Sequence, residues 1–262
     1  MSGDADVVLH HGDCLEIMAG MADKSVDFVF TDPPYGHNNN NGDLIHMREA
    51  VWPSRLSRNQ RIAGLTHGES RAIANDGREA NNIFSSAVTE FRRLLRAGCC
   101  CCCFGGGGPD PMFAKWSLVL DDILEFKQMV VWDKGLIGMG WHYRRSYETV
   151  LVAMKPGAAC RWYDDSGRVE NIIRPGYKGI RKIRPSADQH PTPKPIELVK
   201  HFLGLHTQPG DIVLDPFMGG GVTGEACVEM GRKFIGIEID ERWYEYSRKR
   251  IDAAQAQGRL SV

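Results

Sequence analysis

The sequence predicts an α/β fold, in which a mostly parallel sheet is covered by helices on both faces. Three observations support this prediction. Strand-like and helix-like segments alternate along the chain, a glycine-rich turn joins a strand to a helix near the C-terminus, and an apolar strand near the N-terminus ends at two consecutive prolines. Alternation of this kind is typical of parallel sheets, because helices connect their strands.

Short apolar runs mark the expected strands. They cover residues 7–11, 26–31, 99–103, 129–132, 149–154, 211–214 and 233–238. Apolar residues at helical spacing, often after a glycine turn or a proline, mark the expected helices. One helix starts in the segment GDCLEIMAGM, and the others cover about 83–95, 115–126, 195–205, 222–230 and 241–257.

Two segments depart from this pattern within what we expect to be a single domain over residues 1–262. Residues 36–80 are polar and lack sustained periodicity, and a stretch of this length with little regular structure is usually functional or mobile. We interpret it as a lid-like insertion. Residues 156–190 carry the basic run KGIRKIR with aromatic residues interleaved. This run predicts phosphate contacts, and a solvated charged face is the alternative.

Composition limits the class of protein. Lys and Arg number 32 against 33 Asp and Glu, so any nucleic-acid site must be a local patch. No run approaches the ~20 apolar residues of a membrane span, and MSGDADVV lacks the order of a signal peptide. We therefore expect a cytoplasmic protein without membrane contact.

The cysteines form an unusual cluster, because five of the eight are contiguous at residues 99–103. Adjacent residues of a strand point to opposite faces, and paired ligand spacing of the C-x-x-C type is absent as an independent motif. We interpret the run as small apolar residues of a buried strand and expect no metal site.

The strand at residues 26–31 runs directly into Asp32, Pro33, Pro34 and Tyr35. Proline has no N–H to donate, so two prolines end the strand and stiffen the chain. A carboxylate and an aromatic ring are therefore presented rigidly at the end of a strand. A rigid surface turn is the alternative interpretation of this tetrapeptide taken alone.

The segment DIVLDPFMGGGVTGEACVEMGRKFIGIEID reads as strand, glycine turn, helix and strand. Gly219, Gly221 and Gly224 satisfy G-x-G-x-x-G, and Glu238 follows Gly219 by 19 residues, which is the pattern of a nucleoside-binding site with a ribose acceptor. Only 24 residues follow Glu238, too few for the remaining strands. We therefore expect the cofactor unit at the C-terminus of the domain and Asp32 in the N-terminal half.

The order of these motifs resembles the adenine and cytosine amino-methyltransferases of DNA in the permuted order called the β class. TDPPYG is similar to their catalytic motif and DPFMGGGVTGEA to their S-adenosylmethionine motif. GRKFIGIEID, HPTPKP, GDCLEIM, VVWDK and YRRSYETVLVAMKPG match further family segments. The resemblance implies a Rossmann-like sheet in circularly permuted methyltransferase order with a small target-recognition insertion.

The resemblance also assigns the cofactor site. It implies that Glu238 accepts from the ribose hydroxyls, that Asp13, followed by Cys14, accepts from the adenine amino group, and that Lys194 and Thr192 lie near the carboxylate. The methionine and ribose side would be surrounded by Asp215, Phe217, Gly219, Gly221 and Thr223. One departure is that three glycines are consecutive, with Gly220 added between Gly219 and Gly221.

The catalytic assignment explains the rigid tetrapeptide. The lone pair of adenine N6 is delocalised, and acceptors aimed at its hydrogens would free it to attack a methyl group. Asp32 and the Pro33 carbonyl would be those acceptors, Pro34 would stiffen the turn, and Tyr35 would stack on the base. A base in a duplex must be flipped out to reach them. Phosphate contacts are assigned to Lys178, Arg181, Lys182 and Arg184.

The leading interpretation is thus a DNA adenine-N6 methyltransferase acting on double-stranded DNA, of the kind found in restriction-modification systems, and the resemblance admits a homodimer. Transfer to the N4 amino group of cytosine is the first alternative, although aspartate as first residue of the tetrapeptide favours adenine where serine would favour cytosine. Transfer to RNA or a protein amide, a nicotinamide oxidoreductase and a non-catalytic nucleic-acid-binding module are further alternatives.

Overall fold

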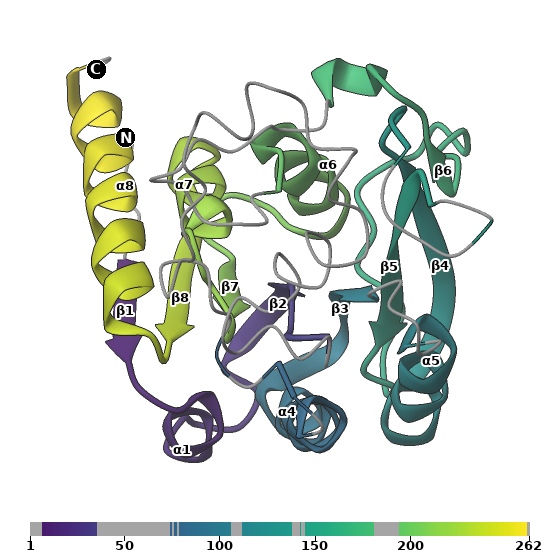
Figure 1. Cartoon of the computed structure of the whole chain (residues 1–262), viewed down its shortest axis with the longest axis horizontal. Helices are drawn as coiled ribbons and strands as arrows, with labels where there is room; N and C mark the ends of the chain where they lie inside the picture. The colour runs from purple at the N-terminus through teal and green to yellow at the C-terminus, as the bar shows by residue number, and fades with distance from the viewer. Residues whose placement is uncertain are drawn as a thin grey trace.

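The fold is known from a computed structural model that describes residues 7–35, 74, 76–77, 79–105, 112–137, 142, 145–180 and 194–260. Its centre is an eight-stranded sheet in the order β1-β8-β7-β2-β3-β5-β4-β6 (Figure 1). The strands are β1 (Val7–His11), β2 (Val26–Thr31), β3 (Leu95–Gly105), β4 (Glu125–Asp133), β5 (Tyr147–Met154), β6 (Ile172–Ile173), β7 (Ile212–Asp215) and β8 (Lys233–Glu238).

Helices follow most of these strands, as the alternating pattern predicts. They are α1 (Cys14–Ala19), α4 (Ala80–Leu94), α5 (Met112–Ile123), α6 (Ile196–His206), α7 (Val222–Glu229) and α8 (Glu241–Leu260), with a short 3₁₀ helix, η3 (Tyr177–Gly179). In the described part of the chain, no helix has the length and apolar character that crossing a membrane requires.

Most of the sheet is parallel, which confirms the predicted fold class, and β5 is the exception. It pairs antiparallel with both β3 and β4. The expected helix over 115–126 is too long at its C-terminal end, because β4 already begins at Glu125 and Phe126 pairs with Ala153 of β5. Pairing with a distant strand decided that boundary, and local helical periodicity could not show it.

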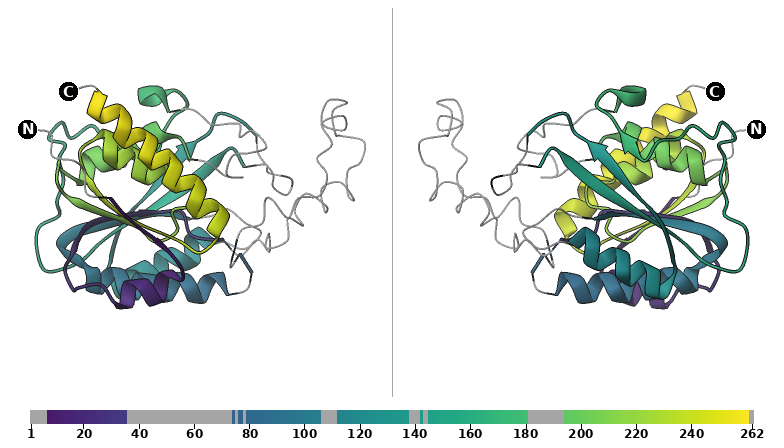
Figure 2. Two further views of the ribbon diagram at one scale, coloured as in Figure 1. Left: turned by 90° about the vertical axis from the view of Figure 1, so that its left-hand side faces the viewer. Right: turned by 90° about the vertical axis from the view of Figure 1, so that its right-hand side faces the viewer.

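The helices cover the two faces of the sheet in two layers (Figure 2). On one face, α1, α4 and α5 pack their apolar residues, among them Met18, Phe91 and Trp116, against the sheet. On the other, α6, α7 and α8 contribute Phe202, Ala226 and Ile251 to a second core.

The cysteine run lies in the middle of β3 and is buried on both faces. Cys99, Cys101 and Cys103 belong to the core beneath α1, α4 and α5, whereas Cys100 and Cys102 belong to the opposite core. This alternation is the two-residue period of a strand. The interpretation of the run as small apolar residues of a buried strand is confirmed.

The strands β2 and β7 lie side by side at the centre of the sheet, where the chain order reverses. From β2 the chain moves to β3 on one side, and from β7 it moves to β8 on the other. Parallel strands end at the same edge, so Asp32 after β2 and Asp215 at the end of β7 are brought together. Ligands of α/β sheets bind at such a reversal.

The two chain halves also meet at β1, which pairs parallel with β8. The Gly12 backbone N–H donates to the Glu238 carbonyl at 3.0 Å. The start of the chain is thereby placed beside the strand that carries the expected ribose acceptor, as the permuted order requires.

Gly224, in α7, shows why the G-x-G-x-x-G pattern needs its last glycine. A Cβ added there would lie 2.4 Å from Ile251 Cδ1 and 2.7 Å from Phe234 Cε1. The absence of a side chain therefore allows α7 to pack directly on β8 and α8.

Gly224→Ala is expected to lower the free energy of unfolding by ~1–3 kcal/mol, because overpacking a full core forces its neighbours to move. Urea unfolding measures the change. Gly204→Ala is the control: it lies within α6 with only Met230 Cε near its Cβ position, at 3.9 Å, and should gain ~0.5–1 kcal/mol. Equal stability of the Gly224→Ala protein and the wild type would contradict the packing role.

Candidate active site

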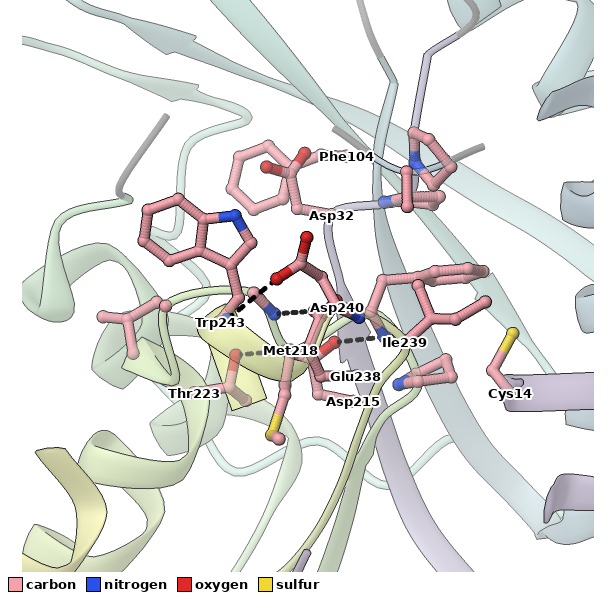
Figure 3. Close-up of a pocket in the computed structure, with 18 of the residues that line it drawn as sticks. Cys14, Asp32, Phe104, Asp215, Met218, Thr223, Glu238, Ile239, Asp240 and Trp243 are labelled. Atoms are coloured by element: carbon pink, nitrogen blue, oxygen red, sulfur yellow. Dashed lines mark hydrogen bonds between the residues drawn. The ribbon is translucent and has the colours of Figure 1, made fainter. Parts of the chain in front are cut away.

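A cavity of about 200 Å³ opens at the carboxyl edge of the sheet where β2 and β7 end (Figure 3). It is lined from both halves of the chain. The predicted site residues on its wall are Asp13, Cys14, Asp32, Pro33, Pro34, Tyr35, Lys194, Asp215, Phe217, Gly219, Thr223 and Glu238. The tetrapeptide after β2 and the glycine turn after β7 therefore share one cavity.

The Asp32 carboxylate is held by two partners. Its Oδ1 accepts from the Tyr35 hydroxyl, and its Oδ2 lies 2.5 Å from Lys194 Nζ. The Tyr35 ring in turn packs beside Trp116, with 5.9 Å between ring centroids. The two prolines thus direct both the acid and the aromatic ring at the cavity.

Lys194 connects Asp32 to a second partly buried acid, Glu148 of β5, whose Oε2 lies 3.2 Å from the ammonium. Burial lowers the pKa of Lys194, but Asp32 and Glu148 outweigh it and raise that pKa above its usual range. Burial raises the pKa of Glu148, but Lys194 and Lys134 outweigh it and lower that pKa to about 2. Lys194 is therefore a cation and Glu148 an anion.

The pKa of Asp32 is shifted in the opposite direction from the pKa of Glu148. Burial raises the pKa of Asp32 above its usual range, although the charge of Lys194 opposes this rise. Among the described residues, Asp32 has a single close cation, whereas Glu148 has two, since Lys134 Nζ also lies 2.9 Å from its Oε1. The charge of Asp32 is accordingly the more sensitive of the two to its surroundings.

Asp215 is enclosed by donors. Thr31 Oγ1 donates to its Oδ1 at 2.7 Å, Thr223 Oγ1 to its Oδ2 at 2.6 Å, and the Phe217 N–H to its Oδ1 at 3.2 Å. Burial is the largest effect and raises the pKa of Asp215 to about 7, even though these bonds lower it. The carboxylate ties the end of β2 to the turn after β7.

Glu238 shapes the glycine turn from the end of β8. Its Oε2 accepts from the Gly219 N–H and its Oε1 from the Asp240 N–H, both at 2.9 Å (Figure 3). Burial raises the pKa of this carboxyl. Because each carboxylate oxygen can accept more than one hydrogen bond, both retain capacity for ligand hydroxyls.

Asp13 and Cys14 lie at the start of α1. The Asp13 side chain caps the helix, because Oδ1 accepts from the Leu15 N–H at 2.8 Å and the Glu16 N–H at 3.2 Å. Burial raises the pKa of the Cys14 thiol to about 12, so Cys14 serves as an apolar wall and not as a thiolate.

The position of Gly221 differs from the one expected for a residue that contacts the cofactor. Gly219 and Gly220 line the cavity, but Gly221 is not among the lining residues. A Cβ at Gly221 would lie 2.6 Å from Ser247 Cβ, and its φ is +73°. The glycine is required for the turn and for the close approach of α8.

Sequence reasoning assigned no site role to several residues on the wall. Ile239, Asp240 and Trp243 follow Glu238 and line the cavity (Figure 3). Other parts of the wall are formed by Phe30, Phe104, Met218, Ala74, Asp76, Ile83 and Arg250. The position of Ile239 and Asp240 directly after the ribose-type strand was the only available signal.

Some predicted residues lie elsewhere. Lys178 is exposed in η3 and does not line the cavity. Outside the described residues are Thr192, Arg181, Lys182, Arg184 and residues 36–73 of the expected insertion.

Comparison with known proteins identifies the family. A family model for DNA methylases matches residues 26–249, which is most of the 262-residue chain. The chain belongs to this DNA methylase family. The resemblance to the DNA amino-methyltransferases, first seen in the motifs, is confirmed.

Individual relatives of the methylase are distant but match over nearly its whole length. It is 25% identical to the DNA adenine methyltransferase YhdJ of Escherichia coli (strain K12), over 96% of this chain and 85% of that protein. Among solved structures, TTHA0409 of Thermus thermophilus, complexed with S-adenosyl-L-methionine, matches with a TM-score of 0.64 and 20% identity, covering 95% of this chain and 96% of that one.

The cytosine-N4-specific PvuII DNA methyltransferase also shares the fold of the methylase. Its TM-score is 0.66 at 17% identity, over 97% of this chain and 92% of that one. The predicted methyltransferase fold is therefore confirmed.

Proposed function

We propose that this methylase transfers a methyl group from S-adenosylmethionine to the N6 amino group of adenine in double-stranded DNA. The observation that supports this most directly is the shared cavity, in which Asp32 and Tyr35 face the turn formed by Asp215, Gly219 and Glu238. A methyl donor held by the turn would lie beside a base held by the tetrapeptide. The adenine activity in the name of YhdJ supports the same target.

The residues present fit the proposed cofactor. The buried Glu238 carboxylate is an acceptor suited to ribose hydroxyls, and Gly219 and Gly220 let the backbone approach closely. Cys14, Ile239 and Trp243 supply apolar surfaces for an adenine ring. When bound, S-adenosylmethionine supplies the electrophilic methyl group on its sulfonium.

The other predicted cofactor residues already have partners within the protein, which limits how they would contact the cofactor. Asp215 and Thr223 bond each other at 2.6 Å, so they would meet the methionine part as a unit. Asp13 already caps α1 through Oδ1 and would use its remaining acceptor capacity for the adenine amino group. Lys194 has one N–H left after Asp32 and Glu148, which would meet the carboxylate of the cofactor; Thr192, the other residue expected near that carboxylate, lies outside the described residues.

The chain's own part in the reaction is to bind and orient the base. The Asp32 carboxylate and the Pro33 carbonyl accept from the amino hydrogens, which leaves the nitrogen lone pair free to face the methyl group. Entry of the base replaces the hydrogen bond between Tyr35 and Asp32 and frees the Tyr35 ring to stack. The stacking offsets ~1–3 kcal/mol of the unstacking cost.

Cytosine N4 is the alternative target, favoured by the fold shared with the PvuII enzyme. That fold is common to both activities, so it does not separate them. The aspartate that begins the tetrapeptide at Asp32 supports adenine in this proposal.

We further propose roles for the two segments outside the regular fold. Ala74 and Asp76, near the end of the 36–80 insertion, line the cavity, which supports a lid over the site. In the 156–190 segment, Arg174 and Lys178 are exposed, which supports phosphate contact by this segment and by Arg181, Lys182 and Arg184. A cytoplasmic location and a homodimer remain part of the proposal, and sedimentation tests the latter.

Glu238→Ala is expected to weaken S-adenosylmethionine binding by ~1–3 kcal/mol, because buried hydroxyls would lose their acceptor. Isothermal titration calorimetry measures the affinity, and circular dichroism checks the fold. Glu241→Ala is the matched control, since Glu241 is an exposed acid at the start of the next helix and should leave affinity unchanged. Wild-type affinity in a folded Glu238→Ala protein would reject the ribose assignment.

Labelled methyl transfer to unmethylated genomic DNA, followed by nucleoside analysis, tests the function itself, and N6-methyldeoxyadenosine is the expected product.

Asp32→Ala should lower the single-turnover rate at least ~100-fold, as for loss of one preorganised polar group at a reacting centre. Cofactor affinity should change little. Asp23→Ala, at the exposed opposite end of β2, should transfer normally. Methylated cytosine would establish the alternative, and a fast Asp32→Ala enzyme would place the chemistry elsewhere.

We expect joint replacement of Arg181, Lys182 and Arg184 by glutamine to make the DNA affinity less dependent on salt. The slope of log affinity against log salt concentration should become less negative by ~0.9 per lost phosphate contact. Fluorescence anisotropy at several salt concentrations measures the slope. The control replaces Lys24 and Lys127, which lie where β2 and β4 begin, at the opposite edge of the sheet. An unchanged slope in the triple variant would mean that the segment is a solvated charged face.

A further inference from the structure

Glu148 is a partly buried acid whose position follows from β5, the strand that runs antiparallel to both of its neighbours. β5 runs against β3 and β4, so its first residues lie at the carboxyl edge, where β2 ends. Glu148 is the second residue of β5. It does not line the cavity itself but lies behind Lys194, which does.

We propose that Glu148 is a positioning residue for methyl transfer, which holds the Lys194 ammonium against Asp32 and so fixes the Asp32 carboxylate toward the target base. This inference rests on the proposed function of Asp32. Glu148 acts through Lys194 and touches neither the base nor the cofactor.

The contacts form a continuous chain from one strand to the other. Lys134 Nζ lies 2.9 Å from Glu148 Oε1, Glu148 Oε2 lies 3.2 Å from Lys194 Nζ, and Lys194 Nζ lies 2.5 Å from Asp32 Oδ2. The two carboxylates balance the two ammonium groups. The Phe104 ring supports the same placement, because its centroid is 4.6 Å from Lys194 Nζ.

Glu148 Oε2 is the informative atom in this chain. It is buried and lies 3.2 Å from the Lys194 ammonium. A buried carboxylate costs stability unless a cation is close. If Glu148 had only a structural role, its pair with Lys134 through Oε1 would be sufficient. The approach of Oε2 to Lys194 therefore points to a role at the site.

The titratable groups around Lys194 come from several elements. They are Asp32 after β2, Tyr35 beside it, Glu148 of β5, and beyond these Lys134, Asp76 and Asp215. Removing the charge of Glu148 leaves Asp32 as the close anion, and burial then lowers the pKa of Lys194. Lys194 would lose its proton at a lower pH and release Asp32.

The test compares Glu148→Gln with the wild type in single-turnover methyl transfer over a range of pH, at saturating cofactor and DNA. The rate should fall at a lower alkaline pH in Glu148→Gln than in the wild type, because Lys194 loses one close ion partner. The plateau rate should fall about 10-fold, within the ~100-fold that a misplacement of about 1 Å can cost. The apparent KM for DNA should stay unchanged.

Glu125→Gln is the matched control, because Glu125 forms an exposed pair with Lys127 on the adjacent strand β4, with 2.5 Å between Nζ and Oε2. Its pH profile should coincide with that of the wild type. Glu148→Asp retains the charge and should place the alkaline limb between those of Glu148→Gln and the wild type. A Glu148→Gln profile that coincides with the wild-type profile would overturn the proposal.

A second measurement is independent of methyl transfer. In protein carrying ¹³C-labelled lysine, the Lys194 signal is identified by its absence from Lys194→Arg, and its pH titration is followed by NMR. Glu148→Gln should titrate at lower pH than the wild type, and an unchanged titration would refute the proposal. If the wild type transfers no methyl group while this titration still shifts, the proposed function fails and the ionic chain stands.

Discussion

The hydrogen bond from the Thr31 hydroxyl to Asp215, 2.7 Å long and buried, is the contact on which the site depends. It joins residues 184 positions apart in the chain. Thr31 is the last residue of β2, directly before Asp32, and Asp215 is the last residue of β7, directly before the glycine turn. A single bond therefore joins the end of β2, where the proposed reacting residues follow, to the end of β7, where the proposed cofactor turn follows.

This bond is available because β2 and β7 are neighbours at the reversal of strand order. The reversal leaves their carboxyl ends uncovered by crossing connections, so that a cavity can form there. Asp215 also accepts from Thr223 in the first turn of α7. The same carboxylate therefore connects β2 to the first turn of α7.

Each oxygen of the Asp32 carboxylate has a partner in the cavity. One oxygen meets Tyr35 and the other meets Lys194. The ionic chain through Lys194 and Glu148 continues into β5. The antiparallel strand β5 thus contributes to a site at the carboxyl ends of the parallel strands, because the amino end of β5 lies at that edge of the sheet.

The sequence by itself determined the α/β class, most strands and helices, and the main chemical groups of the site. Asp32 and Glu238 could be found because prolines and glycines act locally on the backbone, and the cysteine run because two-residue alternation is a local property. Only the tertiary structure decided that β5 is antiparallel, that α5 ends at Ile123, and that Gly221 packs on α8 instead of lining the cavity. It alone placed Glu148 behind Lys194 and Trp243 on the wall. These features depend on pairing and packing between segments far apart in the chain, and local residue patterns do not record such contacts.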